Sequence, residues 1–358
     1  MATATLQEEA VDWGEVAERA RRRRRWTALL LYAFLTLASL PIIVPYLWLF
    51  TVAFSAEGGG TSTYVLWRTL AVLLPALVAF WLINATLDDP RRLRLALLAL
   101  LGVTVLALAV VIGPHVHLQN WRFLWNPDFA QDLKYSATGV GAVQFPSVWT
   151  AFGNSLALAL TQMLIVVTVA TLAGYYVSRF DFRGRAGFLK ALLVLHAFPA
   201  MTLIIPIFLL MYWSGLLDTI TGVVLVICTL ELPFAIFIMK GFFDAVPWDI
   251  EMSAMTDGAS RRQAFVYVVL PQVRIGMLAI GIFAFLRGWE EYVFVRTLLF
   301  DKQNWVMSLY LFWVAEDVMG VDYGIVTAVG VLYVLPSVVL YTFTQKYLTQ
   351  MTVGGIKG

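Results

Sequence analysis

Residues 246–271 read VPWDIEMSAMTDGASRRQAFVYVVLP, a polar segment that separates two long apolar stretches of the chain. It begins with the signals of a short helix. Pro247 suits a first helical turn, and the carboxylates of Asp249 and Glu251 complement the positive end of the helix dipole. Gly258 permits the left-handed or tight turn that ends such a helix. We therefore predict a short helix that stops at this glycine.

A second short helix is predicted directly after the turn. Ser260 is followed three residues later by Gln263, which is the spacing of a capping box. Pro271 disfavours helical geometry at the residue before it, so we expect the second helix to end ahead of this proline. Together the two helices predict a compact helix-turn-helix. Such a rigid knob transmits force only if a soluble partner grips it.

The sequence on both sides of this knob is that of a membrane protein. Of 358 residues, 60% are hydrophobic and 13% are charged, and the mean hydropathy is +0.79. This composition excludes an ordinary soluble globular domain. The apolar residues form runs of about 20, the length that crosses a hydrocarbon core of about 30 Å. We predict an all-α membrane protein with about eight transmembrane helices, at roughly 27–54, 66–87, 92–113, 151–177, 188–212, 219–240, 274–297 and 323–345.

Arginines indicate the orientation of these spans. They gather at 21–25, 91–94, 179–185 and 261–262, and under the predicted span count all four groups fall on one side. Such clusters mark the cytoplasmic side of a membrane. We therefore expect a multi-pass protein with both termini and the knob in the cytoplasm. The run at 21–25 is interpreted as an anchor of the first span that also meets lipid headgroups, not as a nucleic-acid patch.

Several kinds of chemistry are not predicted for this chain. No G-x-x-x-x-G-K-[ST] segment occurs, so we do not expect the chain itself to cradle nucleotide phosphates. His115 and His117 alternate, but no cysteine or carboxylate is spaced to complete a metal site with them, and no metal is predicted. Glu290 and Glu291 alone do not supply a catalytic set. We therefore predict a non-catalytic chain that binds no cofactor of its own.

The motifs of residues 151–358 resemble, in order and spacing, the MalG-type permease subunits of binding-protein-dependent ABC sugar importers, in the maltose and α-glucoside branch. The knob is similar to the EAA loop of that family at Glu251, Ser253, Ala254, Asp257, Gly258, Ala259, Phe265, Leu270 and Pro271. Further similar motifs are Asn154-Ser155-Leu156, Tyr175 to Arg185, Phe198-Pro199, Ile205-Pro206, Gly215-Leu216, Pro233, Gly241-Phe242-Phe243 and Gly354 to Gly358. The resemblance implies a type I ABC importer core in a bacterial inner (plasma) membrane.

The chain departs from the family pattern at three places. Met252 stands where the strict Glu-Ala-Ala triplet has its glutamate, and Glu290 stands where the family usually has the asparagine of Trp-Asn-Glu-Phe. An extra hairpin, about 66–113, is inserted between the first span and the shared core. Its almost wholly apolar faces favour peripheral, lipid-facing helices over a place in the transport pathway.

Charge and hydropathy predict an organisation of the chain, and the resemblance implies roles for residues of its core. The segments are a cytoplasmic N-terminal segment with the basic anchor (1–26), the first span with the extra hairpin (27–113), a periplasmic loop (114–150) and the permease core (151–358), which includes the EAA loop (241–273) and the C-terminal tail. Coupling to the ATPase falls to Glu251, Met252, Ser253, Ala254, Asp257, Gly258, Ala259, Phe265 and Pro271. The tail residues that reach the ATPase are Gly354, Gly355 and Lys357, and the loop residues that enter the binding protein are Asp301, Lys302, Gln303, Asn304 and Trp305.

The function that the resemblance implies is ATP-driven import of a sugar, expected to be a disaccharide or an α-glucoside or maltooligosaccharide, by alternating access. The implied partners are a MalF-like second permease subunit, two MalK-like ATPase subunits that hold ATP and Mg²⁺, an extracytoplasmic sugar-binding protein and membrane lipid. No nucleic acid is among them. Polar residues within the spans are candidates for lining the substrate pathway, namely Asn154, Gln162, Tyr212 and Glu291.

Two other functions stay open on the sequence. A secondary, ion-coupled carrier requires inverted repeats and broken helices around a polar centre, and no internal repeat is evident. A structural membrane subunit leaves the cytoplasmic knob unexplained. Arg287 and Glu291 are four residues apart, so they are able to pair on one helix face. Whether they form a structural ion pair or a gate is left open.

Overall fold

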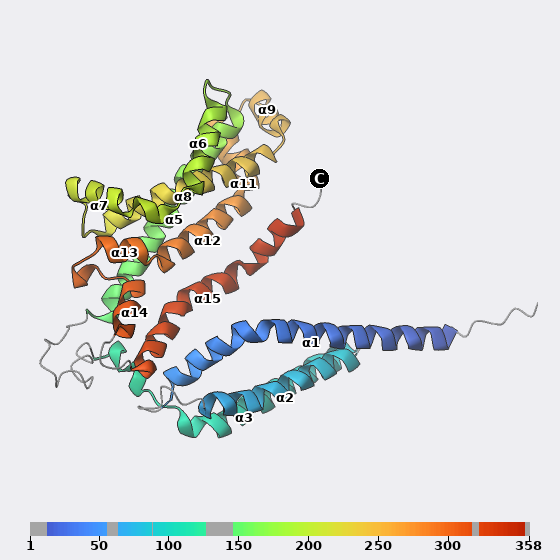
Figure 1. The fold of residues 1–358 in the computed structure, drawn as a ribbon. Coiled ribbons are helices and arrows are strands. Elements are labelled where there is room, and N and C mark those ends of the chain that lie inside the picture. The colour runs from blue at the N-terminus through green and yellow to red at the C-terminus, as the bar shows by residue number, and fades with distance from the viewer. Residues whose placement is uncertain (1–12, 56–63, 88, 127–145, 317–321, 355–358) are drawn as a thin grey trace, which may run out of the picture. The chain divides into compact units, whose positions relative to one another are not determined.

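A computed structural model describes residues 13–55, 64–87, 89–126, 146–316 and 322–354, and every regular element in these ranges is a helix (Figure 1). Among these described residues, six helices are long and apolar enough to cross a membrane. The number rises to eight if each of two bent helix pairs is one span. The predicted all-α membrane class is therefore confirmed. The chain divides into two compact units, one of Met1–Trp121 with Asp322–Ala328, the other of Arg122–Val321 with Val329–Gly358.

The first unit is built on three apolar helices, α1 (Trp13–Ala53), α2 (Tyr64–Thr86) and α3 (Pro90–Ile112). Helix α2 packs against both α1 and α3. The extra hairpin predicted at 66–113 is formed by α2 and α3. No residue of α3 is buried, and its apolar side chains project on all sides of the helix. Such a surface is stable in lipid, as the sequence predicted for this hairpin.

A short polar contact closes the outer end of this unit. Beyond α3 the chain forms two 3₁₀ turns, η1 (Gly113–His115) and η2 (Gln119–Leu124). Asn120 in η2 is buried, and its Nδ2 donates to the carbonyls of Ala53 at 3.3 Å and Ser55 at 2.9 Å. Because the last carbonyls of a helix lack partners within the helix, this side chain caps α1.

The second unit is organised around α5 (Val148–Arg179), which packs along α8 (Ile220–Asp244) and α12 (Arg274–Glu290). Close approach of the helices depends on glycine. A Cβ at Gly174 of α5 would lie 2.7 Å from the Cβ of Met239 on α8. Toward the other end of α5, Trp289 of α12 is buried, and its ring centroid lies 5.5 Å from that of Phe152. The indole Nε1 of Trp289 donates to the carbonyl of Tyr333, on α15 (Tyr323–Gly354), at 2.9 Å.

Two predicted spans are interrupted in the structure. The predicted span over 188–212 is bent, because α6 (Arg185–Ala197) meets the helical segment of η4 (Ala200–Leu203) and α7 (Ile204–Trp213) at 89°. The break falls at Phe198, which is extended with ψ 131° because Pro199 follows it. The predicted span over 274–297 is interrupted near its end. Helix α12 ends at Glu290, Glu291 is extended, and α13 (Val293–Leu298) follows.

The helix after the knob does not end ahead of Pro271, contrary to the sequence prediction. It continues through α10 (Arg261–Gln263), a π-helical stretch η5 (Ala264–Val269) and α11 (Leu270–Gln272). In the π-helical stretch the N–H of Leu270 bonds to the carbonyl of Phe265. Pro271 then stands in the first turn of α11, where its missing N–H costs nothing. The break comes at Val273, and the next helix is turned by 71°.

We expect Gly174→Ala to destabilise the second unit, because the added methyl group would overlap the Cβ of Met239 and force α5 and α8 apart. Overpacking of this kind costs about 1–3 kcal/mol. Gly153→Ala, also on α5, is the matched control, since a Cβ there meets nothing within 4 Å. Thermal unfolding followed by fluorescence-detected size exclusion in detergent measures both variants. Equal melting temperatures would contradict the close packing of α5 against α8.

Candidate functional site

The knob predicted from the sequence is built around α9 (Trp248–Thr256), with Pro247 immediately before the helix as its cap. Gly258 ends the knob's first helix in the left-handed region, with φ 96°. The N–H of Ala259 donates to the carbonyl of Ala254 at 3.0 Å, and the N–H of Gly258 donates to the carbonyl of Met255 at 3.1 Å. This pair of bonds is a Schellman motif, which satisfies carbonyls at the end of the helix. The predicted glycine turn is confirmed.

The predicted capping box is also present. The N–H of Ser260 donates to Oε1 of Gln263 at 2.8 Å, and the N–H of Gln263 donates back to Oγ of Ser260 at 3.4 Å. These two bonds fix the start of α10 directly after the turn. Residues 248–260, called the coupling knob below, therefore have their geometry specified at both helix ends by local sequence signals.

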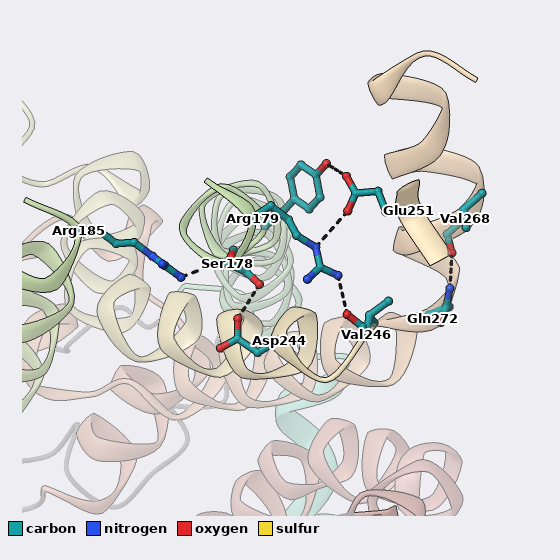
Figure 2. Close-up of polar contacts among 9 residues, drawn as sticks. Ser178, Arg179, Arg185, Asp244, Val246, Glu251, Val268 and Gln272 are labelled. Atoms are coloured by element: carbon teal, nitrogen blue, oxygen red, sulfur yellow. Dashed lines mark hydrogen bonds and ion pairs between the residues drawn. The ribbon is translucent and has the colours of Figure 1, made fainter. Parts of the chain in front are cut away.

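A buried acid attaches the coupling knob to α5. Glu251 has only 1% of its side chain exposed, and it accepts from Oη of Tyr175 at 2.5 Å and from Nε of Arg179 at 3.0 Å. Figure 2 shows the side chains of Glu251 and Arg179 pointing toward one another. Arg179 also donates to the carbonyl of Val246 at 2.9 Å. The carboxylate that the sequence assigned to the helix dipole is thus held in a buried ion pair.

Aromatic rings enclose this ion pair. The ring of Tyr175 lies 4.4 Å from that of Phe265 and 5.5 Å from that of Phe243, centroid to centroid. The guanidinium of Arg179 lies 5.3 Å from the centre of the Trp248 ring. Apolar walls strengthen an ion pair by excluding water. Phe265, which the resemblance assigned to ATPase coupling, lies on the inner side of the coupling knob and packs against α5.

A second contact links α5 to the end of α8, next to the coupling knob. Ser178 donates to Oδ1 of Asp244 at 2.6 Å (Figure 2), and Lys240 pairs with the same carboxylate. Arg185 donates through Nε to the carbonyl of Val177 at 2.8 Å, which satisfies a carbonyl at the C-terminus of α5. The C-terminal end of α5 is therefore fixed to α8, to α9 and to the start of α6.

Apolar side chains of the coupling knob are exposed on more than one side of α9. Trp248 is 42% exposed, and Ile250 and Met252 are each 37% exposed. Among the other residues assigned to coupling, Ser253, Asp257, Gly258 and Pro271 are exposed, and Ala254 and Ala259 are half-buried. Exposed apolar side chains on a short surface helix are typical of a protein contact. Met252, where the family has glutamate, is exposed, whereas Glu251 beside it is buried.

Residues 298–305 form a loop that is held by an unusual residue. Asp218 has φ 59°, the left-handed region, and its carboxylate accepts from the N–H of Phe300 at 2.9 Å and of Asp301 at 3.0 Å. Asn304, in the 3₁₀ turn η6 (Lys302–Asn304), donates to the carbonyl of Asp218 at 2.7 Å. These three hydrogen bonds to Asp218 fix the position of the loop. It is the loop that the resemblance predicts to enter the binding protein.

Asn154 holds the same loop from α5. Its Nδ2 donates to the carbonyls of Gln303 at 2.7 Å and Trp305 at 2.9 Å. The adjacent Ser155 accepts from the N–H of Met307, the first residue of α14 (Met307–Ala315), at 2.7 Å. Asn154 was predicted to line the substrate pathway, and that role stays a prediction. The contacts in the structure favour a role in fixing the loop.

The other residues predicted for the pathway lie in different surroundings. Gln162 is buried, lies against Gly288, and its amide atoms have no hydrogen-bond partner among the described residues. Tyr212 on α7 is 63% exposed. Glu291 is paired with Arg287 at 3.2 Å and accepts from the N–H of Phe294 at 3.0 Å. The ion pair predicted from the spacing therefore exists, and its second bond favours a structural role.

Some site residues were not predicted from the sequence, and some predicted ones lie outside the described residues. Tyr175 and Arg179 belong to a motif that carried the resemblance, but no local pattern indicated that they bind Glu251. No sequence pattern indicated that Asp218 binds the 298–305 loop. Of the predicted tail residues, Gly354 is the last residue of α15, and Gly355 and Lys357 lie outside the described residues.

Residues 167–352, about half of the chain, match the family of binding-protein-dependent transport system inner membrane components. The chain belongs to this family of membrane permeases, as the sequence motifs predicted. A similar protein is the diacetylchitobiose uptake system permease NgcG of Streptomyces coelicolor, 32% identical over 196 residues, which are 54% of this chain and 65% of NgcG. The match thus spans slightly less than two thirds of NgcG.

Two further comparisons agree with this assignment. The maltodextrin transport system permease MdxG of Bacillus subtilis is 30% identical over 208 residues, 58% of this chain and 75% of MdxG. A chain of a bacterial ABC transporter involved in the import of the acidic polysaccharide alginate has the same fold, with a TM-score of 0.62. The match covers 91% of this chain and 98% of that one at 18% identity, so it concerns the fold alone.

We expect Glu251→Ala to release the coupling knob from α5, because it leaves the guanidinium of Arg179 buried and unpaired. Removing one partner of a buried pair costs about 3–5 kcal/mol. Hydrogen exchange of the amides of residues 246–257 measures the release and should become faster. Asp249→Ala, an exposed acid on the same helix, is the matched control and should leave exchange unchanged. Equal exchange in both variants would show that the ion pair does not hold α9.

Proposed function

We propose that the chain is one transmembrane permease subunit of an ATP-driven sugar importer. The observation that carries the proposal is the coupling knob, which exposes apolar side chains while its buried Glu251 is bound to α5. An exposed apolar helix that is rigidly attached to a transmembrane helix is suited to transmit movement from a soluble partner. The proposed partner is an ATPase subunit.

In this proposal the exposed and the buried residues of α9 have separate tasks. Trp248, Ile250 and Met252 enter a cleft of the ATPase, where their apolar surface is removed from water. Glu251 does not contact the ATPase, because its two oxygens are engaged by Tyr175 and Arg179. A displacement of α9 therefore passes to α5 through a charged contact that is short and enclosed.

Helix α5 then connects the two ends of the permease. Asn154 near its start holds the 298–305 loop, and Arg179 at its end holds the coupling knob. At 1.5 Å per residue, the 25 residues between them span about 38 Å of helix. The helix has no proline to act as a hinge. ATP-driven movement of the knob would thus displace the loop that we assign to the binding protein, which supports alternating access.

The proposed assembly contains this chain, a second permease subunit, two ATPase subunits and an extracytoplasmic sugar-binding protein. ATP and Mg²⁺ are held by the ATPase subunits, and this chain contributes no catalytic group. Both termini of the chain lie in the cytoplasm. Names of relatives that refer to diacetylchitobiose, trehalose and maltodextrin support an oligosaccharide substrate. We propose a disaccharide or an α-glucoside or maltooligosaccharide.

Cysteine cross-linking in native membranes tests the coupling role. With the buried Cys228 replaced by alanine, Ser253→Cys or Ala259→Cys on the knob should form a disulfide with a cysteine in the docking cleft of the co-expressed ATPase. The yield should change when ATP is added, because nucleotide moves the knob. Lys302→Cys, exposed in the loop proposed to lie outside, is the matched control and should not react.

Failure of every position along 248–260 to cross-link, with both proteins present and folded, would overturn the importer proposal. A carrier that works without an ATPase would then be the better explanation. Cross-links that form equally from Lys302→Cys would show that the proposed orientation is wrong.

A further inference from the structure

The first unit contains a groove that the transport function does not use. Helices α1, α2 and α3 enclose a space of about 300 Å³ that is partly open to the surroundings. Its walls include Leu47 and Phe50 of α1, Phe54 directly after that helix, and Val65 and Leu73 of α2. This volume is within the range of ligand-binding pockets.

The walls of the groove offer no free polar group. Thr51 and Thr69 also line it, but each hydroxyl donates to a carbonyl of its own helix, to Trp48 at 3.0 Å and to Val65 at 2.8 Å. A groove with such walls favours an alkyl chain over water or a sugar. Its location among apolar spans places it where lipid chains are the surrounding solvent.

One end of the groove carries a positive charge. His115 lines this end, and its Nε2 accepts a hydrogen bond from Arg68 at 2.9 Å. The guanidinium of Arg68 lies 4.2 Å from the centre of the Tyr64 ring. Neither partner is an acid, and none of the salt bridges among the described residues includes Arg68. Among the described residues, the charge of Arg68 is therefore held in place by Tyr64 and His115 but not neutralised by an acid.

We propose that this groove binds one anionic phospholipid, with an acyl chain between α1, α2 and α3 and the phosphate against Arg68. Charge complementarity selects this occupant. A guanidinium at the membrane surface attracts a phosphate, and an adjoining apolar groove accommodates the attached chain. An apolar helix from another protein would fill the groove but would leave the charge of Arg68 without a counter-ion. The extra hairpin thus acquires a specific ligand, which its apolar sequence did not indicate.

Photolabelling of the full-length chain in phosphatidylcholine vesicles tests this site. The vesicles contain a small fraction of phosphatidylglycerol that carries a photoreactive group in one acyl chain, and labelled peptides are identified by mass spectrometry. Labels are expected on the walls, within 47–54 and 65–73. A phosphatidylcholine probe with the same acyl group should label these walls about fivefold less, the factor expected from one basic residue near a membrane surface.

Variants test whether the charge of Arg68 causes the preference for the phosphatidylglycerol probe. Arg68→Gln should reduce wall labelling by the phosphatidylglycerol probe about fivefold, and Arg68→Lys should largely restore it. Arg92→Gln, at the other end of the same hairpin and largely exposed, is the matched control and should change nothing. Thr51→Trp fills the groove without altering Arg68, and it should abolish wall labelling by both probes.

Three results would overturn the proposal. Equal labelling of the walls by the two probes would mean that the groove holds bulk lipid without selection. Unchanged labelling in a folded Arg68→Gln variant would show that Arg68 does not bind the phosphate. Absence of label from the walls, with label on the exposed face of α3, would mean that protein covers the groove. None of these results bears on the coupling knob, so the site is tested independently of the transport function.

Discussion

The carboxylate of Glu251 lies between Tyr175 and Arg179, with 1% of its side chain exposed. A charge so deeply buried persists only when it is paired and fully hydrogen-bonded. Here the pairing joins the short helix α9 to the long apolar helix α5, which is distant in sequence. Without this contact, α9 would keep only weaker contacts with α5, such as that of Trp248 with Arg179. Its exposed apolar side chains would then be poorly coupled to the transmembrane helix.

Helix α5 also holds a loop of the second unit near its N-terminal end. Asn154 and Ser155 hold the segment 303–307 through three hydrogen bonds, and Asp218 supports that segment from the turn before α8. Polar contacts hold both ends of α5, whereas nearer its middle the helix packs closely against α12, where a Cβ at Gly288 would lie 3.0 Å from the Cα of Ala159. Polar contacts have few alternative partners in an apolar surrounding, so they fix the register of what they join. This division explains how one helix connects two surfaces that lie on opposite sides of a membrane.

Local features of this fold were predictable from the sequence, and long-range ones were not. The turn at Gly258, the box of Ser260 with Gln263 and the pair of Arg287 with Glu291 all involve residues within four positions of each other. Glu251 was read as a dipole partner because its real partner, Arg179, is 72 residues away. The bend before Pro199 and the passage of a helix through Pro271 also depend on packing, since the same residue type breaks one helix and begins a turn in the other.

The central claim is that α9 and α5 move as one body when nucleotide binds. Double electron–electron resonance tests this claim. Spin labels are placed at two exposed positions, Leu172 on α5 and Ser253 on α9. The labelled chain has Cys228 replaced by alanine. The assembled importer is compared without nucleotide and with trapped ATP. The account predicts one narrow distance distribution that is the same in both states, and a broad one in Glu251→Ala. A distance that shifts when ATP binds to the unaltered pair would contradict it.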